Sequence, residues 1–152
     1  MEFPYAKVLD FPKHQKRTRI LPWIRVGIFN PKSPLKIVFT LGLVDSGADI
    51  SIVDREIGKE LGYETAKGIP EKIIGLGGAK TYGFGHKVGF LLEDPDDNSN
   101  TIKYFDYVIF TKNTFPSTMP QQTAIYGTIG FFRHLMVTFV YPKSIIIDPP
   151  SS

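Results

Sequence analysis

Short runs of β-branched and aromatic residues, separated by Gly, Pro, Asn and Asp, make up most of this sequence. Side chains of these types favour extended strands, and the turn-forming residues between them favour short connections. The pattern therefore predicts a mostly β protein. The expected strands are residues 3–9, 20–29, 35–44, 69–74, 81–92, 102–110, 137–141 and 144–147.

Only two stretches have the pattern of a helix. In the first, Asp54 can cap two helical turns whose apolar face begins with Ile57, and Gly62 can end them. The second stretch, residues 131–136, is shorter. Between the last two expected strands, Pro142 predicts a tight turn, because proline presets a turn and cannot continue a central strand.

The length of 152 residues fits one domain, which we expect to span residues 1–152 with a flexible tail at 148–152. A hydrophobic content of 42% with 22% charged residues is typical of a globular chain and not of a disordered one. The absence of cysteine excludes disulfides and thiolate chemistry. No secretory signal and no apolar run of membrane-spanning length is present, so we expect a cytoplasmic protein without membrane association.

Positive charge gathers in an N-terminal extension, residues 1–19, where residues 13–19 form a basic run. Such a run can contact phosphate groups or an acidic surface. No interleaved aromatic residues, nucleic-acid-binding module or second basic stripe accompanies it. We therefore expect a solvated segment, with nucleic-acid binding as a weaker alternative.

A single carboxylate, Asp45, ends an apolar run and enters a glycine-containing turn within residues 41–49, Leu-Gly-Leu-Val-Asp-Ser-Gly-Ala-Asp. Gly47 lets the backbone bend and its N–H can donate to the carboxylate, while Ser46 offers a hydroxyl. Two carboxyls that share one proton can activate a water and protonate a carbonyl oxygen. Asp-Ser-Gly occurs only once, so this chemistry requires a symmetric dimer. Taken alone, the tripeptide is more typical of an ordinary β-turn.

Residues 43–51, Leu-Val-Asp-Ser-Gly-Ala-Asp-Ile-Ser, resemble the active-site motif of the retroviral-type aspartic proteases, the retropepsins. Residues 73–78, Ile-Ile-Gly-Leu-Gly-Gly, are similar to the flap tip that closes over substrate in that family. Residues 127–130, Gly-Thr-Ile-Gly, and the apolar residues 135–142 resemble its late apolar-Gly segment and closing strands. These segments follow the family's order and span nearly the whole chain.

The resemblance implies a single-domain acid protease fold, a closed β-barrel-like structure with one or two short helices and a flap hairpin. It also implies a homodimeric aspartic endopeptidase that cuts a peptide or protein substrate without metal or cofactor, with Asp45 as its catalytic residue. Active-site support would come from Ser46 and Gly47, and substrate contacts from Ala48, Asp49, Leu76, Gly77 and Gly78.

Two features depart from the family pattern, namely residue 131 and the segment of residues 130–137, which is short for the family's helix. Retroviral members commonly carry Arg directly after the glycine of the late segment, whereas Phe131 follows Gly130 in this chain. The arginine that would support Asp49 is therefore missing from that position. Two alternatives stay open, namely a plain glycine-rich hairpin in place of a flap, and a non-catalytic dimerisation or peptide-binding module in place of a protease.

Other chemistries lack their required residues. Residues 74–81 end in a pattern like that of a phosphate-binding loop, but Ile74 and Ala79 occupy the glycine positions. Residues 93–105 begin like a calcium loop but lack its turn glycine and its final Glu. The three histidines are isolated and have no metal-ligand spacing, so we expect no metal site.

Overall fold

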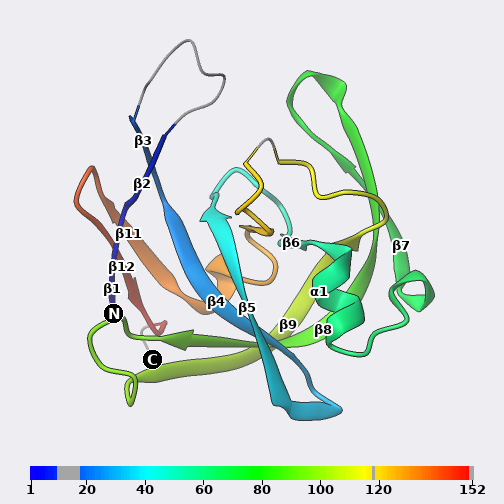
Figure 1. The fold of residues 1–152 in the computed structure, drawn as a ribbon, viewed down its shortest axis with the longest axis horizontal. Helices are drawn as coiled ribbons and strands as arrows, with labels where there is room; N and C mark the ends of the chain where they lie inside the picture. The colour runs from blue at the N-terminus through cyan, green and yellow to red at the C-terminus, as the bar shows by residue number, and fades with distance from the viewer. Residues whose placement is uncertain (10–17, 118, 151–152) are drawn as a thin grey trace.

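The computed structural model describes residues 1–9, 18–117 and 119–150, and strands dominate it (Figure 1). Six of them close into a barrel, because β4 (Trp23–Asn30), the first strand of the main sheet, also pairs with β8 (Lys80–Glu93), the sixth. In order around the barrel they are β4, β5 (Ser33–Val44), β10 (Ala124–Tyr126), β6 (Ile52–Val53), β9 (Thr101–Thr111) and β8. The expected mostly β, barrel-like architecture is confirmed at this level.

Strand β10 lies between β5 and β6, although it comes much later in the sequence. It runs parallel to β5, with Tyr126 opposite Val44, and antiparallel to β6, with Ala124 opposite Val53. The sequence analysis did not predict β6 or β10, because strands of two or three residues are too short to show an alternating pattern. Their pairing brings the late segment of the chain beside the end of β5.

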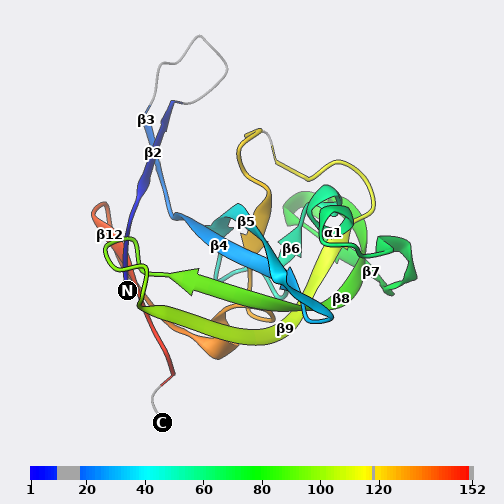
Figure 2. The same cartoon turned by 60° about the horizontal axis from the view of Figure 1, so that its bottom comes forward.

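Further strand pairings lie outside the barrel. Strand β7 (Ile69–Ile74) pairs with β8 alone and makes a hairpin with it. A three-stranded sheet has the order β1 (Glu2–Pro4), β12 (Ser144–Asp148) and β11 (Met136–Val140). Strands β2 (Ala6–Leu9) and β3 (Thr18–Leu21) form a separate two-stranded hairpin, which Figure 2 shows standing clear of the barrel.

Two of the expected strands are each divided in two. The expected strand 3–9 breaks at Tyr5, because β1 pairs with β12 whereas β2 pairs with β3. The expected strand 20–29 breaks at Pro22, which has no N–H to donate to a neighbouring strand. The basic residues 13–17 and the tail residues 151–152 lie outside the described part of the chain.

The first expected helix is confirmed as α1 (Arg55–Glu60). The Asp54 carboxylate accepts a hydrogen bond from the Glu56 N–H over 2.9 Å, and Gly62 follows the helix with a φ of 81°. Residues 131–136 do not form an α-helix. They contain only a 3₁₀ turn, η3 (Phe132–His134), and β11 begins at once after Leu135. Two more 3₁₀ turns are η1 (Thr65–Lys67) and η2 (Leu76–Gly78).

Large apolar side chains from alternate strand positions fill the barrel. The fully buried ones include Val26, Ile28, Val88, Phe90, Val108, Phe110 and Tyr126. Phe3 of β1 and Ile145 and Ile147 of β12 belong to the same core, so the three-stranded sheet and the barrel pack as one unit. Within the described residues, the search for a helix that is long and apolar enough to cross a membrane found none.

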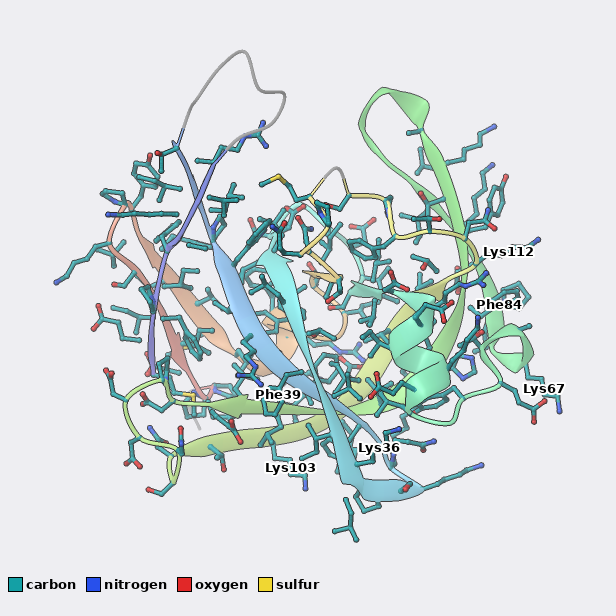
Figure 3. The ribbon with its side chains drawn as sticks, in the orientation of Figure 1. Lys36, Phe39, Lys67, Phe84, Lys103 and Lys112 are labelled. Carbon is teal, nitrogen blue, oxygen red and sulfur yellow. The ribbon has the colours of Figure 1, made fainter. Side chains whose placement is uncertain are left out.

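Positive charge on the described surface is dispersed. Lys36 lies on β5, Lys67 in η1, Lys103 on β9 and Lys112 just after β9, and all four are exposed (Figure 3). Lys103 also lies over the Phe29 ring, 4.6 Å from its centroid. These four lysines therefore lie on different parts of the structure and do not form one stripe.

Candidate active site

The backbone at Asp45 is held from two sides as it leaves β5. The N–H of Val44 donates to the carbonyl oxygen of Pro22 over 2.9 Å, and the N–H of Asp45 donates to that of Tyr126 over 3.0 Å. Pro22 directly precedes β4, and Tyr126 ends β10. The end of β5 is thus fixed between both of its neighbours in the barrel.

A glycine permits the close approach of β5 to β10. A Cβ atom at Gly42 would lie 2.5 Å from the Tyr126 ring and 2.9 Å from the Ala124 side chain, so no larger residue fits. The Tyr126 hydroxyl is buried, where it donates to the Thr40 carbonyl oxygen over 3.0 Å and lies 2.7 Å from the Thr40 hydroxyl. Burial raises the pKa of Tyr126 well above its ordinary value, so the hydroxyl stays neutral.

The turn at Asp45 has the hydrogen bond expected from the sequence. The Gly47 N–H donates to one carboxylate oxygen of Asp45 over 2.9 Å, and the Ala48 N–H donates to the Asp45 carbonyl oxygen over 3.2 Å. Asp45 is half-buried, whereas Ser46 and Gly47 are exposed. The turn therefore orients the carboxylate while leaving the next two residues open to a partner molecule.

The late segment, residues 127–130, runs alongside the loop that follows Asp45. The Thr128 N–H donates to the Ala48 carbonyl oxygen over 2.8 Å, and the Ser51 N–H donates to the Ile129 carbonyl oxygen over 2.8 Å. A Cβ at Gly127 would lie 2.7 Å from the Ala48 oxygen, so the contact requires glycine. Two of the three segments noted in the sequence therefore meet.

Asp49 is exposed, and only its main chain takes part in this arrangement. Its carbonyl oxygen accepts a hydrogen bond from the Ile129 N–H over 2.9 Å. Within residues 1–9, 18–117 and 119–150, the Asp49 carboxylate has no hydrogen bond or ion pair. Phe131, which directly follows Gly130, is buried and stacks on Tyr126 with ring centroids 5.2 Å apart.

The glycine-rich segment of residues 75–79 forms the tip of the β7–β8 hairpin. The Gly75 N–H donates to the Ala79 carbonyl oxygen over 2.7 Å. Gly77 and Gly78 have φ values of 73° and 79°, a conformation that favours glycine, and Leu76 precedes them in η2. In Figure 1 the hairpin, in bright green, projects from the same end of the barrel as the loop after β5. Its exposed, bent tip is open to solvent.

A buried carboxylate that the sequence analysis did not single out lies behind the late segment. Asp106 points inward from β9 and is only 3% exposed. It accepts hydrogen bonds from both ends of the Arg133 guanidinium, from the Gly130 N–H over 2.8 Å and from the Tyr107 N–H over 2.8 Å. His134 lies 2.9 Å from it.

The hydrogen bonds keep Asp106 ionised in this buried place. Burial alone raises the pKa of the carboxyl, but the hydrogen bonds from Arg133 and the other donors outweigh it and hold the pKa below its ordinary value of 3.8. The sequence contained a signal for this residue. Along β9, Ile102, Tyr104 and Val108 alternate on the inward face, and the acidic residue occupies the position between the last two.

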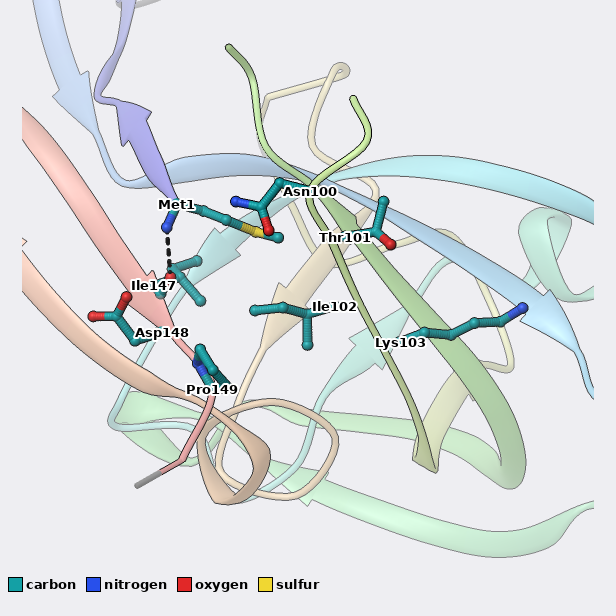
Figure 4. Close-up of a pocket in the computed structure, with 8 residues that line it drawn as sticks. All are labelled: Met1, Asn100, Thr101, Ile102, Lys103, Ile147, Asp148 and Pro149. Carbon is teal, nitrogen blue, oxygen red and sulfur yellow. Dashed lines mark hydrogen bonds between the residues drawn. The ribbon is translucent and has the colours of Figure 1, made fainter. Parts of the chain in front are cut away.

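Two pockets in the described part of the chain lie away from the Asp45 turn. One of about 440 Å³ lies between the start of β9, the end of β12 and the N-terminus (Figure 4). It is lined by Met1, Asn100, Thr101, Ile102, Lys103, Ile147, Asp148 and Pro149. A hollow of about 280 Å³ beside Phe39 and Arg25 also contains no residue of the 45–51 loop or of the hairpin tip. Neither of these two pockets includes Asp45.

No family model and no curated protein matches this chain. Among the described residues, the search found no group of three or more His, Cys, Asp or Glu side chains that could hold a metal ion. The functional interpretation therefore depends on the motifs and on the geometry of the Asp45 turn.

Proposed function

We propose that this chain is an aspartic endopeptidase that acts as a homodimer, with one Asp45 from each subunit. The observation that supports it best is the Asp45 turn itself. Its carboxylate is oriented by the Gly47 N–H, its backbone is fixed to Tyr126, and Ser46 and Gly47 beside it are exposed.

A second subunit is needed because one chain supplies one carboxylate of this kind. Asp106 is buried and paired with Arg133, so it is not accessible to a substrate. Asp49 is exposed but has no turn N–H directed at its carboxylate among the described residues. A two-fold axis at the Asp45 turns brings two identical carboxyls together with the fewest new contacts.

Large apolar side chains on the edge of the three-stranded sheet support association. Phe139 is 41% exposed and Tyr141 is 69% exposed, at the end of β11. Exposed apolar surface of this kind is typical of interaction sites. We propose that the second subunit covers part of it.

In the proposed reaction, the two Asp45 carboxyls share one proton. The ionised carboxyl takes a proton from a water molecule, and the water oxygen attacks the scissile carbonyl carbon. The protonated carboxyl of the other subunit donates to the carbonyl oxygen. Collapse of the resulting tetrahedral intermediate breaks the C–N bond. The carboxyl that took the water proton gives it to the leaving amine, and the other carboxylate takes a proton back from a hydroxyl of the intermediate. No covalent bond to the enzyme forms.

The proposed substrate is an extended peptide that lies between the Asp45 turns and the two β7–β8 hairpins. Backbone N–H groups at the tip residues Leu76 and Gly77 would pair with the main chain of the peptide, and Gly78, whose N–H donates to the Gly75 carbonyl oxygen over 3.1 Å, would lie beside it. On the opposite side, Ala48 and the exposed carboxylate of Asp49 would contact the substrate backbone. The hairpins would act as flaps that exclude water while the peptide is cut.

A peptide-library digest at several pH values tests the proposal. We expect cleavage by the wild-type protein and none by Asp45→Asn, with the variant still folded and dimeric. Asp96→Asn makes the same chemical change at an exposed loop position and should cleave like wild type. Turnover retained in Asp45→Asn would exclude the assignment. Saturable peptide binding without products, in all three proteins, would favour the non-catalytic peptide-binding module.

A further inference from the structure

The Asp106 carboxylate accepts hydrogen bonds from the Arg133 side chain and from the backbone N–H groups of Gly130 and Tyr107. The Asp106 side chain is 1% exposed, whereas that of Arg133 is 48% exposed and covers it from the solvent side. The Arg133 Nε atom donates to the Asp106 Oδ2 atom over 2.6 Å, and the same oxygen accepts from the Gly130 N–H over 2.8 Å. One carboxylate therefore joins an arginine to the backbone of the late segment.

Both polar groups of the Gly130 backbone are held by residues of β9. Its N–H donates to Asp106, and its carbonyl oxygen accepts from the Tyr104 hydroxyl over 3.2 Å. The Tyr104 ring in turn stacks on His134, with centroids 4.6 Å apart. Gly130 itself has a φ of 95°, and a Cβ there would lie 2.6 Å from the Ser51 hydroxyl. Gly130 is thus packed closely between β9 and the loop that follows Asp45.

The position of Gly130 determines where that loop lies. Ile129, directly before it, exchanges backbone hydrogen bonds with Asp49 and Ser51 over 2.9 and 2.8 Å. The Gly127 N–H donates to the Ser51 hydroxyl over 3.0 Å. A shift of the late segment must therefore displace residues 48–51 and, through them, the Asp45 turn.

We propose that Asp106, held in place by Arg133, is a positioning residue for Asp45. This inference depends on the proposed peptidase function, because it assigns the pair a role in that site. Two carboxyls that share a proton tolerate little displacement, since a shift of a fraction of an ångström changes both their separation and their contact with the water. The pair fixes the late segment from behind and so limits such shifts.

The kinetic test compares variants of the pair with a matched control. Arg133→Gln and Asp106→Asn should lower kcat by about ten- to a hundredfold, with KM changed by less than about twofold, because substrate contacts remain while the carboxyl geometry loosens. Arg133→Lys should restore part of kcat, since it retains the charge but not the paired geometry. Arg55→Gln removes a partly exposed arginine that pairs with Glu56 and donates to the Lys112 carbonyl oxygen, away from the late segment, and it should keep the wild-type kcat.

Amide hydrogen exchange provides a readout that does not depend on catalysis. We expect faster exchange at residues 127–130 and 48–51 in Arg133→Gln, with the β4–β5 ladder unchanged. Unchanged exchange in those two segments, or equal acceleration throughout the barrel, would overturn the positioning role. If the wild-type protein cuts no peptide, the proposed function fails, and local acceleration in these segments would still show that the pair fixes the Asp45 loop.

Discussion

The N–H of Asp45 donates to the carbonyl oxygen of Tyr126 over 3.0 Å, which ties the candidate catalytic residue to the end of β10. Tyr126 is itself fixed by the hydrogen bonds of its buried hydroxyl to Thr40 on β5. The carboxylate is therefore placed by a segment far away in the sequence, and changes to that segment should alter the site without touching Asp45.

Gly42→Ala should disturb this contact directly. The new Cβ would lie 2.5 Å from the Tyr126 ring, so β5 and β10 must separate. We expect a loss of roughly 1–3 kcal/mol in the free energy of unfolding and a fall in peptidase activity. Gly85→Ala is the matched control, because its Cβ would meet no atom closer than 3.7 Å. Urea denaturation of both variants checks this prediction, and equal midpoints would contradict it.

At the tip of the β7–β8 hairpin an added side chain would have room, but the backbone conformation there is unfavourable for any residue other than glycine. Nothing lies within 4 Å of a Cβ at Gly77 or Gly78, yet both have positive φ. Gly77→Ala should therefore strain the hairpin by about 1 kcal/mol and lower kcat/KM, while the melting temperature of the barrel changes little. Gly75→Ala, at a φ of −88°, serves as the control. The same kcat/KM for both variants would argue against a flap with a defined tip.

The ionisation of Asp106 should make the free energy of unfolding depend on pH. Its pKa in the folded protein lies below the ordinary value of 3.8, so the unfolded chain binds this proton more tightly. The ionised carboxyl therefore contributes its full stability above about pH 4, and the contribution is lost as the pH falls from that value through the lowered pKa.

Asp106→Asn isolates this contribution. The variant should be less stable than wild type by about 2 kcal/mol near pH 6, because it removes the buried charge that accepts the hydrogen bonds of Arg133, and the difference should shrink toward pH 2.5. Thermal unfolding between pH 2.5 and 6 measures it, with Asp96→Asn as the exposed control. A difference that stays constant over this range would show that the charge of Asp106 does not stabilise the fold.

Long strands with alternating side chains were predictable from the sequence. The expected segments 35–44, 69–74, 81–92 and 102–110 correspond to β5, β7, β8 and β9, and the Asp54 cap was correct as well. The short strands β6 and β10 were missed because their extended conformation depends on neighbours in space. The short helix expected at 131–136 is present only as the three-residue 3₁₀ turn η3, because β11 begins directly after Leu135.

The candidate site was predictable where it is local in sequence. The hydrogen bond from Gly47 to Asp45 and the left-handed glycines at the hairpin tip follow from short motifs. Asp106 and Arg133 could not be paired in this way, because their contact depends on how the late segment folds back over β9. An acidic residue on the apolar face of a strand was the available signal.

Mixing wild-type protein with Asp45→Asn tests the central claim most directly. The two are combined in equal amounts at constant total concentration and left until their subunits have exchanged, and peptide cleavage is then measured. If each site needs two Asp45 carboxyls, only the pure wild-type dimers are active, and the mixture should retain about one quarter of the wild-type activity. Retention of about one half, as expected if each chain acted alone, would contradict a site built from both subunits.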